Sequence, residues 1–218
     1  MFTALIAIFM ILNSSTGEFI DVGGTRLPSK QIVSQKVISL ENRYQDRFVN
    51  SVFKDNILLN LRYLKGDVKS KKDINWSQIV RPFKFELKLG SDEVFSFHDD
   101  VLPQFQKKKL ITTGAHFNSL EGFKSDGFLV GDGVCHLASI IYWAAKSAGL
   151  TALAPTNHNF RSIPEVPKDF GVAIYYNPGE KSSNQLQNLY IVNDKNTDIS
   201  FLFEYDGTKL LISVLELI

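Results

Sequence analysis

Cysteine is the scarcest residue of this sequence, because Cys135 is the only one in 218 residues. One thiol cannot form an internal disulfide, and an odd thiol in an exported protein suggests reactivity or pairing with another molecule. The four histidines are widely spaced, and a single cysteine cannot build a thiolate cage, so no metal centre is predicted. The sequence also lacks a P-loop and a GxGxxG motif. We therefore expect no metal and no cofactor.

An excess of one charge sign is missing as well. The 24 Lys and Arg residues against 23 Asp and Glu residues leave a net charge of +1. Nucleic-acid-binding proteins usually carry a basic excess on one face. The dense basic runs, at 69–73 and 106–110, are short and have polar neighbours, which is typical of solvated loops. We therefore expect no nucleic-acid partner.

Long hydrophobic runs are absent apart from a short one at the N-terminus, from Phe2 to Leu12. This run is too short to span a bilayer as a helix, which takes about 20 residues. It resembles the apolar region of a secretory signal followed by the small residues "NSSTG", although no Lys or Arg precedes Arg26. The alternative is a buried first strand or helix. We favour an exported, extracytoplasmic protein, either secreted or anchored, that contacts the membrane only through its N-terminal segment.

The predicted organisation is a signal or anchor segment at 1–17, a linker at 18–35 and a single domain at 36–218. Apolar residues recur with helical spacing between 48 and 64 and stop at Gly66, which predicts an amphipathic helix. Ser39 is a candidate N-cap for a shorter helix before it. The most apolar helix of the chain is expected from Cys135 to Ala148, with Gly149 ending it.

Strands are predicted from alternating or β-branched runs. They are "FKFELKL", "VFSF", "KLITTGAHF", "GFLV" before a tight turn, "GVAIYY", "NLYIV", "DISFLFEY" and "KLLISVLEL", the last two joined by a "YDG" hairpin turn. The fold class is therefore α+β, with a mainly antiparallel sheet packed on a central buried helix that starts at Cys135, and with N-terminal amphipathic helices.

Cys135 lies in the stretch "GDGVCHLAS", at the expected start of the buried helix. Thiols react as thiolates, and the ordinary pKa of cysteine is about 8.5. The unpaired N–H groups and the dipole of a helix N-terminus favour the anion, and the same groups can donate to an oxyanion. Gly131 and Gly133 allow a sharp turn and the close approach of a substrate. The alternative is that Cys135 is a small buried apolar residue.

A cysteine nucleophile needs a base, which is usually a histidine held by a third polar group. His158 is the best-placed candidate, because a strand that returns after the helix can bring it beside Cys135. His136 is a weaker candidate, since neighbouring helix residues point about 100° apart. Asp132 is either a turn residue or a substrate contact, and we favour the turn. Three residues are candidates to orient His158: Asn157, Asn159 and Asp169.

Four stretches of the chain resemble the VanW-like family in sequence and in order. They are "FSFHDDV", "GFLVGDGVCHLASIIYWAAKSAGL", "NHNFRSIPEVP" and "LYIVNDKNTDI", within roughly residues 94–204. The resemblance places Cys135 at the motif cysteine and His158 at the second histidine of the family's "HPH" motif. It implies a cell-envelope role, and some members of the family have L,D-transpeptidase activity, in which a cysteine attacks a peptidoglycan stem peptide and forms a thioester.

The chain also departs from that family pattern. Asp132 replaces the middle glycine of "GGGVCQ", His136 replaces the glutamine, and Ala138 replaces the first serine, whereas Ser139 is retained. Pro155 and Thr156 stand at the arginine and first histidine of "RHPH", and Gly171 stands at a family aspartate for which Asp169 is a possible substitute. The helix "GVCHLASIIYWAAKSAGL" is also, more loosely, similar to the cysteine helix of transglutaminase and papain-like folds.

Three hypotheses follow for function. The first is an exported cysteine acyltransferase that acts on peptidoglycan stem peptides, with a thioester on Cys135 and His158 as the base. The second is a non-catalytic cell-wall binding or accessory domain, and the third is a cysteine peptidase or amidase. The enzyme hypotheses predict a lowered thiol pKa. The site residues are Cys135 and His158, supported by Gly131, Asp132, Gly133, His136, Ser139, Asn159 and Asp169.

Overall fold

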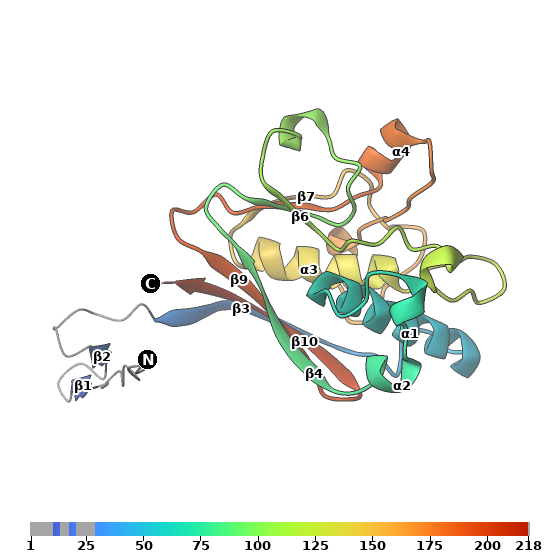
Figure 1. Ribbon diagram of the computed structural model, residues 1–218, viewed down its shortest axis with the longest axis horizontal. Coiled ribbons are helices and arrows are strands. Elements are labelled where there is room, and N and C mark those ends of the chain that lie inside the picture. Colours follow the sequence, from blue (N-terminus) through green and yellow to red (C-terminus); the bar gives the residue numbers. More distant parts are fainter. Residues whose placement is uncertain (1–10, 14–17, 21–28, 218) are drawn as a thin grey trace, which may run out of the picture.

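Two sheets with a helix between them form the framework of the computed structural model, which describes residues 11–13, 18–20 and 29–217 (Figure 1). The larger sheet is antiparallel, in the order β3-β10-β9-β4. Its strands are β3 (Lys30–Ser39), β4 (Phe83–Leu89), β9 (Ile199–Tyr205) and β10 (Lys209–Leu217). The predicted signal or anchor segment at 1–17 lies outside the described residues except for β1 (Ile11–Asn13). This short strand pairs with β2 (Glu18–Ile20).

The smaller sheet has the order β6-β5-β8-β7. Its strands are β5 (Val94–Ser96), β6 (Leu110–Thr112), β7 (Thr151–Leu153) and β8 (Tyr190–Val192). Only β5 and β6 are parallel, so most strand pairs of the two sheets are antiparallel, as predicted.

The helices are α1 (Arg47–Lys65), α2 (Trp76–Ile79), α3 (Val134–Ser147) and α4 (Lys181–Leu186). Single 3-10 turns occur at η1 (Lys71–Asp73), η2 (Pro103–Phe105), η3 (Ser119–Glu121) and η4 (Lys168–Phe170). None of the described helices is long and apolar enough to cross a membrane.

The predicted amphipathic helix is α1. The Asp46 side chain caps it by accepting the Val49 N–H, and Gly66 ends it in the left-handed conformation. Among the described residues α1 is the one long helix before α3, because α2 has only four residues.

Helix α3 occupies the centre of the molecule, as the sequence predicted (Figure 1). It contacts β3 and β10 of the larger sheet, β7 of the smaller sheet, and α1. Its buried side chains lie on several sides of the helix, and three of them are alanines, Ala138, Ala144 and Ala145. Small side chains let neighbouring backbones approach closely. The α+β prediction with a central buried helix is therefore confirmed.

Four local predictions are wrong. Ser39 is the last residue of β3 and caps no helix, because pairing of Ile38 with Leu210 continues the strand to that point. Residues 30–35, placed in a linker by the sequence, belong to the same strand. The stretch 127–130 is a turn with a single bridge from Ser125 to Val130. Residues 171–176 form no ladder, because their N–H groups bond one by one to α3, Thr156, Lys168 and Gln187 rather than to one neighbouring strand.

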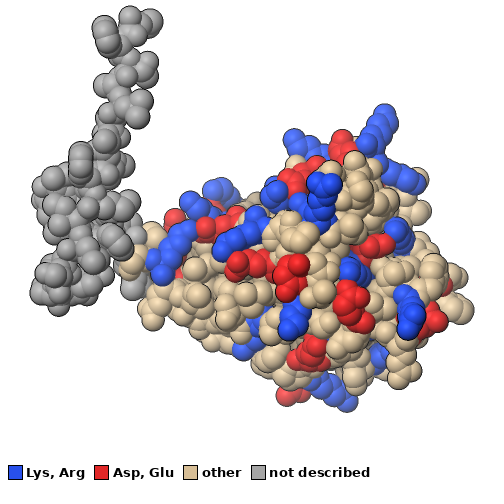
Figure 2. Space-filling model, turned by 90° about the horizontal axis from the view of Figure 1, so that it is seen from below, with Lys and Arg blue, Asp and Glu red and all other residues tan. Residues whose placement is uncertain are grey.

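Charged residues of both signs are interspersed on the face shown in Figure 2. In the larger sheet, Lys84 and Glu204 are direct cross-strand partners, and their charged groups lie 2.8 Å apart. This mixed surface agrees with the near-zero net charge of the chain.

Candidate functional site

Cys135 is the second residue of α3 and lies in a cleft of about 350 Å³. His136, His158 and Asp132 line the same cleft, which we call the Cys135 cleft. The fold therefore brings together a thiol, two imidazoles and a carboxyl from the start of α3 and from the loop after β7.

The thiol of Cys135 contacts the backbone of Ile174. The sulfur donates to the Ile174 carbonyl across 3.5 Å and accepts from the Ile174 N–H across 3.4 Å. The pKa of the Cys135 thiol is raised to about 11, chiefly by burial. The hydrogen bond from the Ile174 backbone lowers this pKa in part, and the negative charge of Asp132 raises it. The predicted lowering is wrong: the thiol is protonated at neutral pH.

Gly131 and Gly133 form the turn that leads into α3, and both have positive φ, 88° and 96°. A Cβ on Gly131 would lie 2.8 Å from the Phe117 carbonyl oxygen, and one on Gly133 would lie 2.5 Å from that of Phe53. The predicted sharp turn is therefore present. The space that the missing side chains leave is filled by the protein's own backbone rather than left open to a substrate.

Asn56, a fully buried residue of α1, holds this turn in place. Its amide nitrogen donates to the carbonyls of Lys124 and Asp132 across 3.0 and 2.9 Å, and its oxygen accepts the Lys124 N–H across 2.8 Å. Sequence reasoning missed Asn56. The available signal was an asparagine on the apolar face of an amphipathic helix, where an amide needs a partner.

His158 is buried, and its Nδ1 lies 3.2 Å from the Arg161 carbonyl oxygen. A carbonyl accepts only, so Nδ1 carries the proton and Nε2 keeps its lone pair when the ring is neutral. Burial lowers the pKa of His158, which favours this neutral form. The orienting group is therefore main chain. Asn159 and Asp169 are exposed and make no hydrogen bond to the ring among the described residues, and Asn157 donates to the Lys168 carbonyl instead.

His136 lies between Phe53 and His158, with ring centroids at 5.0 and 6.2 Å. Burial lowers the pKa of His136 to about 3, with smaller contributions from the positive charges of Arg43 and Arg161. Its Nδ1 is buried without a hydrogen-bond partner in the described part of the chain. The structure thus places His136 in the cleft, although no hydrogen bond among the described residues joins Cys135 to either imidazole.

Ser139 connects α3 to the extended segment that carries Ile174. Its hydroxyl donates to the Cys135 carbonyl across 2.7 Å and accepts the buried Val172 N–H across 2.9 Å. Gly171 precedes this segment, and a Cβ there would lie 2.8 Å from the His158 carbonyl oxygen. No aspartate side chain fits at Gly171, because the His158 backbone packs directly against it.

Asp132 lies beside Asp126 at the cleft. Burial raises the pKa of the Asp132 carboxyl to about 6, and the negative charge of Asp126 adds to this effect. The Asp126 side chain accepts the Phe128 and Leu129 N–H groups across 2.9 and 3.2 Å, which shapes the turn at 126–129. Asp126 therefore has a turn role of its own at 126–129, whereas the Asp132 side chain lines the cleft.

Exposed apolar side chains surround the opening of the cleft. Phe128 is 92% exposed and Phe160 is 79% exposed, and both line the cleft. Leu129, Val130 and Tyr175 are further exposed members of the lining. Large exposed apolar side chains gathered at one cleft are typical of ligand-binding grooves and interaction sites.

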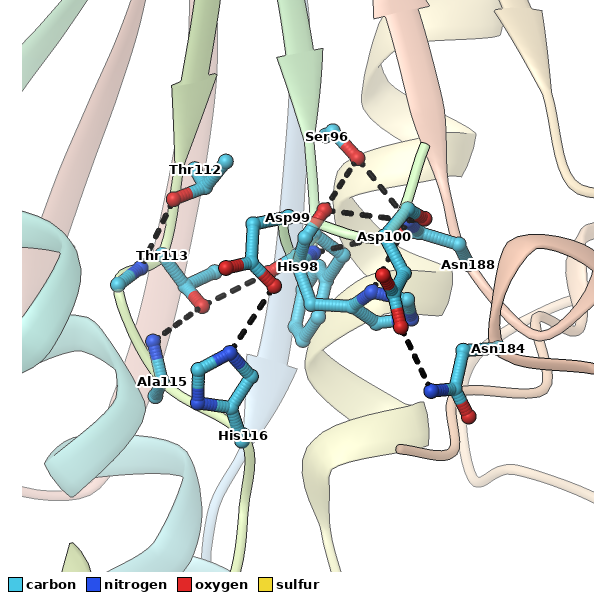
Figure 3. A network of polar contacts seen from close by, with 12 residues as sticks. Ser96, His98, Asp99, Asp100, Thr112, Thr113, Ala115, His116, Asn184 and Asn188 are labelled. Carbon is cyan, nitrogen blue, oxygen red and sulfur yellow. Dashed lines mark hydrogen bonds and ion pairs between the residues drawn. The ribbon is translucent and has the colours of Figure 1, made fainter. Parts of the chain in front are cut away.

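The other two histidines lie outside the cleft, in the polar network of Figure 3. His98 is fully buried, and the Asn188 side chain contacts its Nδ1 across 3.3 Å. His116 contacts Asp99 through Nε2 at 2.9 Å and Glu121 through Nδ1 at 3.1 Å. Burial alone would lower the pKa of His116, but Asp99 and then Glu121 outweigh it and raise that pKa. Both histidines therefore connect loops around β5.

Within the described parts of the chain, no group of three or more His, Cys, Asp or Glu side chains is arranged to hold a metal ion.

The family model described as VanW like protein matches residues 86–215, which is more than half of the chain. The protein therefore belongs to the VanW-like family, as the sequence motifs indicated. The match covers the smaller sheet, β9 and most of β4 and β10, but not β3. It includes the whole of the Cys135 cleft apart from the contributions of α1 and the loop before it. Membership is consistent with a cell-wall associated protein. Comparison with curated proteins and with solved structures gives no match.

Proposed function

We propose that this protein is an exported cysteine acyltransferase that acts on peptidoglycan stem peptides, in the manner of an L,D-transpeptidase. The observation that supports this proposal is that Cys135 and His158 line one cleft, with the Nε2 atom of His158 free to accept a proton. Membership of the VanW-like family points to the same substrate class.

The resting thiol is protonated, so a base has to act during the attack rather than before it. His158 Nε2 takes the proton of Cys135 as the sulfur forms a bond to the carbonyl carbon of the donor peptide. Backbone N–H groups in the first turn of α3 stabilise the oxyanion. The scissile C–N bond then breaks, and the imidazolium returns the proton to the departing amine, leaving a thioester on Cys135.

The second half of the reaction uses an amine of another stem peptide. The amine attacks the thioester carbonyl and gives a proton to His158 Nε2. The C–S bond then breaks, and the proton returns to the sulfur, so that one amide bond has replaced another. If water takes the place of the amine, the product is a shortened stem, and the protein is a peptidase.

The test uses the full chain with a disaccharide tetrapeptide donor and a diamino acid acceptor, and mass spectrometry to detect the crosslinked dimer and the Cys135 thioester. We expect Cys135→Ala to abolish both products and His158→Gln to slow the reaction about 10²–10⁴-fold. His116→Gln is the matched control outside the cleft and should keep the wild-type rate. Product formation at the wild-type rate by Cys135→Ala would rule out both enzyme hypotheses.

A non-catalytic wall-binding domain is the second candidate. It is favoured by one observation: the thiol of Cys135 bonds to the Ile174 backbone and not to an imidazole. In this case Cys135→Ala should sediment with purified peptidoglycan as the wild type does, and no thioester should form with any donor.

A further inference from the structure

The Cys135 cleft contains a positively charged group that the reaction steps above do not use. Arg161 lines the cleft, and it is the one Lys or Arg among the lining residues described. Its Nη1 donates to the Tyr44 hydroxyl across 2.8 Å, and its guanidinium carbon lies 4.1 Å from the centroid of the Tyr44 ring. Tyr44 therefore holds the guanidinium in a defined place.

Arg161 differs from the other arginine near the cleft in its charge partner. Arg43 is buried and pairs with Glu165 across 2.5 Å. No carboxylate pairs with Arg161 in the described part of the chain. A guanidinium presents five N–H donors in a planar fork that matches a carboxylate, and the Tyr44 hydroxyl uses only one of them. The Arg161 guanidinium can therefore bind the carboxylate of a ligand that enters the cleft.

The Arg161 main chain contacts the proposed base, His158. Its carbonyl accepts the Nδ1 proton of His158 across 3.2 Å, so the residue that carries the guanidinium also orients the base. In the proposed reaction the leaving group is one terminal amino acid, and one residue spans about 3.5 Å. The free carboxylate of that residue must therefore lie in the same cleft as the thiol.

We propose that Arg161 binds the terminal carboxylate of the donor stem peptide and makes the protein select donors that end in a free acid. This inference rests on the proposed function. Arg161 is then a specificity-determining residue, and Tyr44 is a positioning residue that acts through it.

The test is a binding measurement in the Cys135→Ala background, which prevents turnover, by calorimetry with three synthetic tetrapeptides. The first ends in a free acid, the second ends in a carboxamide, and the third keeps the terminal acid but has the carboxylate of its diamino acid amidated. We expect the first and third to bind about tenfold more tightly than the second, because one charge-assisted hydrogen-bonded pair is lost.

The acid-to-amide ratio is the affinity for the first peptide divided by the affinity for the second. Arg161→Gln should bring this ratio close to one, and Arg161→Lys should keep part of the wild-type preference. Tyr44→Phe should reduce the ratio without abolishing it. Arg81→Gln removes the same charge at an exposed position outside the cleft and should leave the ratio unchanged.

Equal acid-to-amide ratios in Arg161→Gln and Arg81→Gln would overturn the role of Arg161. Weak binding of the third peptide would overturn it too, because the preference would then depend on the carboxylate of the diamino acid. Both results leave the proposed function intact if the wild type still forms a thioester. Absence of binding to all three peptides, with no thioester in the wild type, would overturn the proposed function together with this inference.

Discussion

The backbone N–H of Ile174 and the sulfur of Cys135 lie 3.4 Å apart, and the thiol returns a hydrogen bond to the carbonyl of the same residue. An extended segment of main chain therefore covers the one thiol of the protein. The helix N-terminus that carries Cys135 favours a thiolate, but burial and the nearby Asp132 charge have the larger effect and keep the thiol protonated.

The first prediction concerns the titration of this thiol. Alkylation of the folded protein by iodoacetamide should report a pKa above the ordinary value of about 8.5, in line with the raised pKa of about 11. Because Cys135 is the only cysteine, the rate reports one site. The same protein unfolded in denaturant is the control and should titrate near the ordinary value. A folded-state pKa below that of the unfolded chain would contradict the hydrogen-bonded, protonated thiol.

The second prediction concerns Ser139, which links Cys135 to the segment that covers it. Ser139→Ala leaves the buried Val172 N–H without an acceptor, so we expect a loss of about 1–3 kcal/mol in the free energy of unfolding. Alkylation of Cys135 at a fixed pH should also become faster, since the covering segment is released from α3. Urea denaturation and alkylation rates measure the two effects.

Ser51→Ala is the matched control for this change. Ser51 is an exposed helix residue whose hydroxyl also donates to a carbonyl, that of Phe48. Its loss should alter stability by no more than about 0.5 kcal/mol and should leave the alkylation rate unchanged. Equal effects of the two variants would show that Ser139 does not hold the segment.

The third prediction separates packing from backbone conformation at the turn before α3. Gly133→Ala combines a positive φ with a Cβ placed 2.5 Å from the Phe53 carbonyl oxygen. We expect a cost of about 2–5 kcal/mol in unfolding free energy, because backbone strain and overpacking add. Gly179→Ala has a similar φ of 89° and nothing within 4 Å, so it should cost only about 1–2 kcal/mol. Similar losses in thermal or urea denaturation would contradict the close approach of α1 to this turn.

The fourth prediction concerns the pH dependence of stability through His116. The folded-state pKa of His116 is raised above its ordinary value of 6.5 by Asp99 and Glu121, against the effect of burial. A raised histidine pKa stabilises the folded state fully below the unfolded-state pKa, and the gain is lost as the pH rises through the folded-state pKa. His116→Gln should therefore lose up to about 1 kcal/mol at pH 5 and little at pH 9.

Asp99→Asn is the companion variant, because it removes the largest charge that favours the imidazolium. Its unfolding free energy should depend less on pH than that of the wild type over the same range. If urea denaturation shows the same difference between wild type and His116→Gln at pH 5 and pH 9, the imidazolium does not contribute to stability.

Local pattern was enough to predict the elements that carry the site. The apolar spacing that ends at Gly66 gave α1, and the apolar run closed by Gly149 gave α3 with Cys135 in its first turn. The turn at 206–207 between β9 and β10 was predicted from its Asp-Gly pair. These features depend on periodicity and turn chemistry, which neighbouring residues determine.

Predictions that depended on partners far along the chain were less successful. The alternation at 171–176 suggests a strand, but no strand lies beside it in register. The N–H groups of residues 172–175 therefore bond in turn to Ser139, Thr156, Cys135 and Gln187. Ser39 resembles a helix cap, but β10 pairs with the segment before it and continues the strand. Strand pairing is a property of the whole fold, which explains both errors.

The sequence by itself determined that a lone cysteine begins a buried helix, that glycines precede it, and that the chain belongs to the VanW-like family. Only the tertiary structure decided what surrounds the thiol. It placed His136 and His158 in one cleft and set the Ile174 backbone against the Cys135 thiol. It also showed that the Arg161 carbonyl orients the His158 ring. The direction of the thiol pKa was decided there too, because burial and the charge of a neighbouring carboxylate arise only when distant segments pack together.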